Sequence, residues 1–224
     1  MKIPVKYALW IPAILATLCG WVQVLPVRSW PDWWDPAWVI LLAATAYAVL
    51  VREVGIGRAR VCAAGAIVAF GCLFAALPVA PGVFGTVVFS ERTLLVSGLG
   101  FPILPPFLAF SLLAIGARAV DSLFPYTGRV GLAVWTAVAV ALPAAICPAF
   151  LGGQRLWWAW GPPVGGAWVG LCALALGCGV VAFGLSFLIP PSTRMHTTRW
   201  SPEVGVWLLV AGLFAASSLA RAMA

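Results

Sequence analysis

Hydrophobic residues occur in seven long blocks along the chain, and short segments with prolines and charges separate them. A helix that crosses a bilayer needs about 20 mostly apolar residues. None of the blocks alternates with the period of two that is typical of a membrane barrel. The pattern therefore predicts an all-α, polytopic membrane bundle, formed by one domain over residues 1–224. The expected spans are 7–27, 37–51, 61–80, 93–117, 130–150, 166–189 and 204–220.

Two proline-containing segments refine this prediction. Asp35 precedes Pro36, which is typical of an N-cap acid followed by a proline at the first helical position of the second span. The fourth span contains Pro102, Pro105 and Pro106. Because proline lacks an amide hydrogen and kinks a helix, we expect this span to be broken or bent.

Composition agrees with a membrane protein, since 63% of the residues are hydrophobic and 8% are charged. A soluble domain usually has about 25% charged residues. The net charge of +7 could indicate nucleic-acid binding, but its distribution along the chain gives a simpler explanation. Most of the positive charge falls in the segments on one side of the predicted membrane.

The positive-inside rule sets the expected orientation. Only four basic residues (Arg28, Arg92, Arg155 and Arg221) fall on the side opposite the N-terminus, which predicts a cytoplasmic N-terminus and an external C-terminus in a bacterial inner membrane. The nine on the cytoplasmic side form a candidate surface for anionic lipid headgroups or an acidic protein partner, and direct nucleic-acid binding is not expected. These nine are Lys2, Lys6, Arg52, Arg58, Arg60, Arg118, Arg129, Arg194 and Arg199.

Tryptophans gather on the predicted outer side. Indole rings prefer the edge of a bilayer, so an interfacial belt explains them, and a lid over an outward-facing cavity is the alternative. The candidate outer aromatic cluster consists of Trp30, Trp33, Trp34, Trp157, Trp158 and Trp160.

Residues able to do chemistry inside the membrane are scarce. All six acids lie in loops or at span ends, and the one histidine, His196, lies in a predicted inner loop. The six cysteines are irregularly spaced, which is typical of small packing residues rather than of a metal site. We therefore predict no catalytic residue, metal or cofactor, since functional membrane sites normally keep ionisable groups at membrane depth.

The middle of the chain resembles the carotenoid-synthesis membrane family that includes the bacterioruberin-type hydratases. The segment 100–105 (GFPILP) resembles the family's Gly-Val-Pro-like step with a second proline, and Trp158-Ala159-Trp160 and Gly165-Gly166 resemble its later aromatic pair and glycine-rich turn. The resemblance covers residues 78–170 and implies a membrane helical fold with a carotenoid or polyprenoid ligand. Cys147 stands before Pro148 where the family has an acid, so the proton donor that hydration needs is missing.

Three functions remain open at this point. The first is a non-catalytic regulator that sequesters a cytoplasmic factor, similar in class and size to the membrane anti-sigma factors that control light-induced carotenoid genes. A sigma factor would then be its partner. The alternative is a membrane-embedded, hydratase- or cyclase-like enzyme of carotenoid or polyprenoid synthesis. A structural subunit of a larger membrane complex is a third reading.

Overall fold

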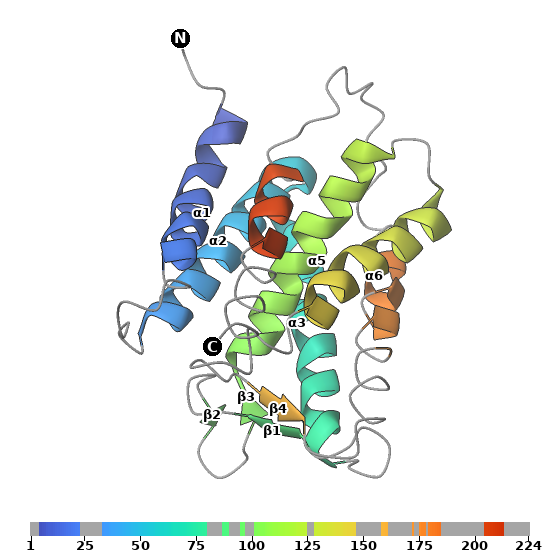
Figure 1. Cartoon of the computed structure of the whole chain (residues 1–224). Coiled ribbons are helices and arrows are strands. Elements are labelled where there is room, and N and C mark those ends of the chain that lie inside the picture. Colours follow the sequence, from blue (N-terminus) through green and yellow to red (C-terminus); the bar gives the residue numbers. More distant parts are fainter. Residues whose placement is uncertain are drawn as a thin grey trace.

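Helices make up most of the described chain (Figure 1). The computed structural model describes residues 5–22, 33–79, 87–89, 95–96, 101–124, 128–146, 158–160, 172, 175–177, 179–184 and 204–212. Each of the seven segments predicted from the hydrophobic pattern contains helical residues, so the predominantly helical class is confirmed. The main helices are α1 (Val5–Val22), α2 (Trp34–Val54), α3 (Ile56–Val79), α5 (Leu104–Leu123) and α6 (Arg129–Ile146).

Three helical segments are long and apolar enough to cross a membrane. They cover Pro36–Val54, Ile56–Ala76 and Leu104–Leu123, with 19, 21 and 20 residues. At about 1.5 Å of rise per residue, each is close to the roughly 30 Å of a bilayer's hydrocarbon core. Shorter apolar helices cover Ala8–Cys19, Arg129–Ala139 and Ala175–Gly184. Length and composition are therefore compatible with a membrane protein.

The prediction of a fourth span over residues 93–117 is wrong in its bounds. Residues in its first half form the short strands β2 (Leu95–Val96) and β3 (Phe101–Pro102), and α5 begins only at Leu104. Pro105 and Pro106 lie in the first turn of α5, where the backbone amides have no acceptor within the helix. The expected break is therefore present, since the segment is interrupted before Leu104, while Pro105 and Pro106 start a continuous helix.

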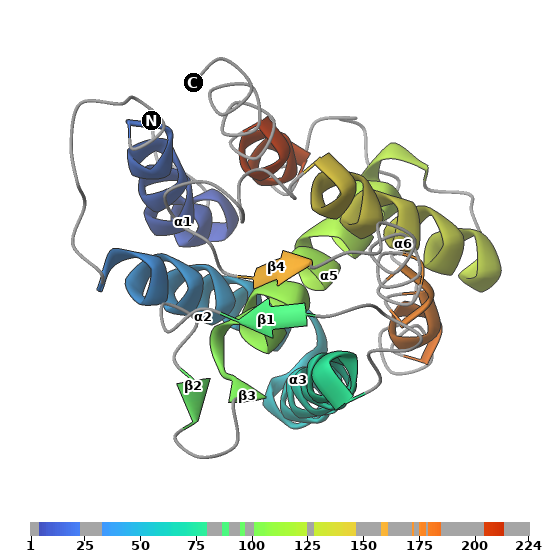
Figure 2. The same ribbon diagram turned by 60° about the horizontal axis from the view of Figure 1, so that its bottom comes forward.

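The structure also contains short strands, whereas the sequence predicts helices alone. Antiparallel pairing joins β2 to β3, and joins β1 (Val87–Phe89) to β4 (Trp158–Trp160). Figure 2 looks onto this end of the molecule, where β1 and β4 lie side by side across the helix ends and β3 lies beside α3. Runs of two or three residues are too short to produce a readable alternation of polar and apolar positions.

Helix α5 lies at the centre of the packing, between α2, α3 and α6 (Figure 1). Within its membrane-length window 67% of the residues are buried, compared with 33% for α3. Its buried Ser111 donates to the Phe107 carbonyl at 2.7 Å, so the hydroxyl is satisfied inside the helix. Helix α5 therefore forms the centre around which α2, α3 and α6 pack.

Two tryptophans join helices through polar contacts. Trp38, buried in α2, donates its indole Nε1–H to Oγ1 of Thr17 in α1 at 3.4 Å. Trp207, in the helical segment 204–212, donates its Nε1–H to the Ala139 carbonyl of α6 at 2.9 Å. Both contacts satisfy an indole donor within the packed helices.

The predicted N-cap at Asp35 is wrong by two residues. Helix α2 begins at Trp34, and Trp33 occupies the N-cap position without a side-chain cap hydrogen bond. The Ala37 amide donates to the Trp33 carbonyl at 3.1 Å, so the helix already includes Asp35 and Pro36 in its first turn.

Candidate functional site

The basic residues of the described chain gather at one end of the helices. Figure 1 shows the start of α1, the junction of α2 with α3, the end of α5 and the start of α6 at this common end, away from the strands. We call it the basic end. All the Lys and Arg residues that fall in the described ranges lie there: Lys6, Arg52, Arg58, Arg60, Arg118 and Arg129.

A single glycine forms the junction between α2 and α3. Gly55 has φ 84° and ψ 158°, a conformation that only glycine adopts readily. Its amide donates to the Val51 carbonyl at 2.9 Å, and its carbonyl accepts from the Ala59 amide at 3.0 Å. The two helices therefore reverse direction with no loop between them, which places Arg52 next to the first turn of α3.

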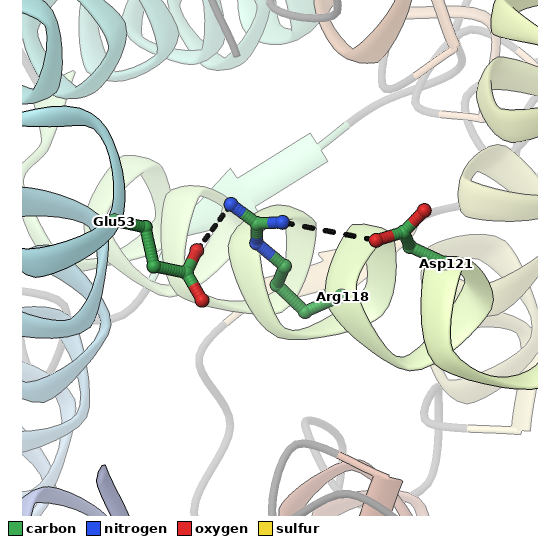
Figure 3. Close-up of polar contacts among 3 residues, drawn as sticks. All are labelled: Glu53, Arg118 and Asp121. Atoms are coloured by element: carbon green, nitrogen blue, oxygen red, sulfur yellow. Dashed lines mark ion pairs between the residues drawn. The ribbon is translucent and has the colours of Figure 1, made fainter. Parts of the chain in front are cut away.

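Arg118 connects α2 to α5 through an ion cluster (Figure 3). Its guanidinium forms an ion pair with Glu53 of α2, and a second nitrogen lies 3.8 Å from Oδ2 of Asp121, three residues further along α5. The three side chains are only partly exposed, between 19% and 30%. Two of the chain's acids are thus engaged with one arginine.

Arg52, Arg58 and Arg60 differ from Arg118 in their surroundings. All three are exposed, and no carboxylate pairs with them among the residues that the structure describes. The first turn of α3 contains no acid, and the positive end of its dipole lies beside the negative end of the α2 dipole, so the excess charge here comes from the arginine side chains. The junction is therefore a site of unbalanced positive charge.

The opposite end holds the described part of the predicted aromatic cluster. Trp33 is 62% exposed at the start of α2, and its ring packs edge-on against Trp34 with 5.8 Å between centroids. Trp158 and Trp160 lie in β4, opposite Phe89 and Val87 of β1. The side chains of Trp158 and Trp160 are outside the described part, so the belt and the lid both remain predictions.

The remaining predicted site residues have no described side chain. Lys6 lies in the first turn of α1, and its side chain is not described. The predicted partner-binding residues Lys2, Arg194 and Arg199 and the aromatic residues Trp30 and Trp157 lie outside the described residues altogether.

Cysteines and hydroxyls define no reactive group in the described part. Cys62 is buried, as expected of a packing residue, whereas Cys19, Cys72 and Cys172 are exposed and form no disulfide. Within the described residues, no group of three or more His, Cys, Asp or Glu side chains could hold a metal ion. Ser122 and Thr136 each have a buried hydroxyl without a hydrogen-bond partner, and they lie on different helices.

The sequence alone does not reveal the role of the two acids beside Arg118. The pair Arg118 and Asp121 has a spacing of three residues, which is a recognisable helical ion-pair signal. The contact with Glu53 has no local signal, because it depends on how α2 packs against α5. Only the tertiary arrangement therefore distinguishes Arg118, which is paired, from the exposed arginines of the α2–α3 junction.

Comparison with protein-family models, curated proteins and solved structures finds no match to this chain. The resemblance to the carotenoid-synthesis family therefore stays a prediction from sequence motifs. The function has to be argued from the charge distribution and the helices.

Proposed function

We propose that the chain is an integral protein of a bacterial inner membrane, with seven spans, a cytoplasmic N-terminus and an external C-terminus. Three helices of membrane length support the membrane location. The orientation is supported by the basic end, because basic residues are enriched on the cytoplasmic side of membrane proteins. Exposed Trp33 at the opposite end fits the wet edge of the other leaflet.

Within that membrane the protein acts as a non-catalytic regulator that sequesters an acidic cytoplasmic factor. The observation that carries this proposal is the charge imbalance at the basic end, where six basic residues stand against two described acids. Both of those acids are engaged with Arg118. Complementary charge steers association and determines which partner is accepted. The motif resemblance points to control of carotenoid genes, with a sigma factor as the sequestered protein.

The distribution of charged residues also favours regulation over catalysis. Within the described helices, charged residues occur only in the first or last two turns. Adding water to a polyene, or cyclising one, needs a proton donor near the substrate. The described interior of the bundle offers no charged group for that task.

Co-purification tests this proposal. Membranes that contain the tagged chain are extracted in a mild detergent, and the retained proteins are identified by mass spectrometry. The expected result is a stoichiometric acidic transcription factor. Retention should fall at least tenfold when Lys6 and Arg129 are both changed to Glu, and it should persist when Arg92 and Arg155 of the predicted outer side are changed to Glu.

Pigment analysis after deletion of the gene separates this proposal from the enzyme alternative. Loss of a sequestering regulator induces the whole carotenoid pathway in the dark. Loss of a hydratase- or cyclase-like enzyme instead leads to accumulation of one precursor. Accumulation of a single precursor, with no retained factor, would contradict the regulatory proposal.

A further inference from the structure

The junction of α2 and α3 lies at the polar boundary of two membrane-length helices. One apolar segment ends at Val54 and the next begins at Ile56, with Gly55 alone between them. Arg52 is two residues before the end of the first segment, and Arg58 is two residues after the start of the second. If these helices span the bilayer, the three arginines of the junction lie at the depth of the lipid headgroups.

Within the part of the chain that the structure describes, no carboxylate balances the charge of this junction. Arg52, Arg58 and Arg60 are exposed and have no carboxylate partner among the described residues, while Glu53 and Asp121 flank Arg118. The C-terminal end of α2 and the N-terminal end of α3 meet here, so their opposite helix dipoles offset each other. An anion beside the junction would therefore be favoured by the three arginine side chains.

Exposed apolar side chains beside the three arginines indicate that the anion belongs to a lipid rather than to an acidic protein. Ile56, at the turn itself, is 54% exposed, and Val61, one residue beyond Arg60, is 60% exposed. A soluble acidic surface would leave these side chains in contact with polar groups. A phospholipid covers them with its acyl chains, while long arginine side chains extend to the phosphates above.

Arginine also matches the chemistry of a phosphodiester. Its planar guanidinium donates two parallel hydrogen bonds to a phosphate, which the point charge of lysine cannot reproduce. Basic residues beside a membrane span bind anionic lipids with about 1 kcal/mol each, or roughly fivefold in affinity.

We propose that Arg52, Arg58 and Arg60 bind the phosphodiester headgroups of anionic phospholipids, with Ile56 and Val61 against the first acyl methylenes. The proposal rests on the membrane-spanning part of the proposed function and is independent of any protein partner.

Native mass spectrometry of the delipidated full chain in a neutral detergent tests this assignment. Phosphatidylglycerol, cardiolipin and phosphatidylcholine are titrated separately, and inorganic phosphate is added as a competitor. We expect at least tenfold tighter binding of the two anionic lipids than of phosphatidylcholine, with no displacement by millimolar phosphate. Equal binding of all three lipids would overturn the proposal, and displacement by free phosphate would assign the site to a soluble anion.

Variants then locate the lipid. The triple change Arg52→Gln, Arg58→Gln and Arg60→Gln should weaken phosphatidylglycerol binding about 100-fold. The corresponding Lys triple variant keeps the charge and should lose less than tenfold. As a matched control, Glu53→Gln with Arg118→Gln removes an ion pair without changing the net charge, and it should leave lipid binding within twofold.

Two outcomes would contradict this location. Retention of full lipid selectivity by the Gln triple variant would place the lipid elsewhere. Tighter binding of an acidic peptide than of either anionic lipid, with the peptide displacing the lipid, would make the junction a protein-binding surface. The lipid selectivity of the unmodified chain decides the question even where a triple variant does not fold.

Discussion

Gly55 is the residue on which the α2–α3 junction depends most. Its φ of 84° combined with a ψ of 158° lies in a region that is essentially restricted to glycine. It also satisfies one backbone group of each helix, the Val51 carbonyl and the Ala59 amide. A single residue can join two long helices here because its backbone both turns and hydrogen-bonds.

Replacing Gly55 with alanine should destabilise the protein by about 1–3 kcal/mol, the cost of holding a side chain in this region. No atom lies within 4 Å of an added Cβ at this position, so the cost is backbone strain rather than a clash. Gly57→Ala is the matched control, since Gly57 lies within α3 and an added Cβ there also meets nothing within 4 Å. That change should be neutral or slightly stabilising. Thermal unfolding in detergent, followed by circular dichroism, measures both, and equal losses would contradict the assignment of strain.

Trp207 compensates for a backbone donor that α6 lacks. Proline at 143 has no amide hydrogen to offer the Ala139 carbonyl four residues earlier in α6. Trp207 donates to that carbonyl at 2.9 Å from a segment 68 residues away. An unsatisfied carbonyl inside a bundle is costly, so the indole stabilises both α6 and the packing of residues 204–212 against it.

Trp207→Phe should lower the free energy of unfolding by about 1–2 kcal/mol, because the Ala139 carbonyl loses its donor. Pro143→Ala restores an amide hydrogen within α6, so the same Trp207 change should cost less in that background. Unfolding of the four proteins of this double-mutant cycle by denaturant in detergent measures the coupling. Strictly additive losses would show that the proline and the indole act separately.

At the scale of elements, one ion pair connects the end of α2 to the central helix. Arg118 lies between Glu53, which belongs to α2, and Asp121, which belongs to its own helix (Figure 3). The first contact joins two elements, whereas the second lies within one helix and places an acid near its negative C-terminal end. The two acids therefore contribute differently, although both flank the same guanidinium.

Glu53→Gln should destabilise the protein by about 0.5–1 kcal/mol, the range of a partly exposed ion pair. The loss of stability should be smaller at high salt, because salt screens the attraction between the two charges. Asp121→Asn should cost less than this, since its oxygen is 3.8 Å away and its charge opposes the helix dipole. Thermal unfolding of both variants at low and at 1 M salt provides the comparison. A larger loss for Asp121→Asn would mean that the contact between helices is not the stabilising one.

The pairing of β1 with β4 is a property of the whole molecule. The two strands come from segments separated by α5 and α6, and they meet at the end opposite the basic residues (Figure 2). The predicted topology places both of these segments outside the membrane on one side. Their pairing agrees with that alternation, since strands on opposite sides of a bilayer cannot hydrogen-bond.

Reporter fusions test the proposed topology. A fluorescent protein that folds only in the cytoplasm should be active when it is fused after Gly128. A phosphatase that folds only outside should be active when it is fused after Phe89 or at the C-terminus. The expected alternation follows from the charge of the basic end. An external reporter active after Gly128 would invert the orientation and remove the proposed cytoplasmic partner surface.

Hydrophobic patterning alone determined the helical class and the approximate position of each helix. Apolar blocks of about 20 residues can satisfy their backbone groups only as helices in lipid, so this inference needs no tertiary information. The same patterning misplaced the start of α5 by eleven residues relative to position 93, because strands of two or three residues leave no period in the sequence. The prolines predict a break or a bend, and the structure has the break before Leu104, with Pro105 and Pro106 in the first turn of α5, where their missing amides would have had no acceptor.

Tertiary structure decided which of the basic residues are available. Arg118 and Arg58 look alike in the sequence, since each lies at the end of an apolar segment. The packing of α2 against α5 brings Glu53 to Arg118, while the tight turn at Gly55 leaves Arg52, Arg58 and Arg60 exposed. Such contacts join residues far apart in the chain, and side-chain pairing of this kind has no local pattern. The sequence by itself therefore determined that positive charge collects at one side, and only the fold decided which arginines are paired within the protein and which are exposed to a ligand.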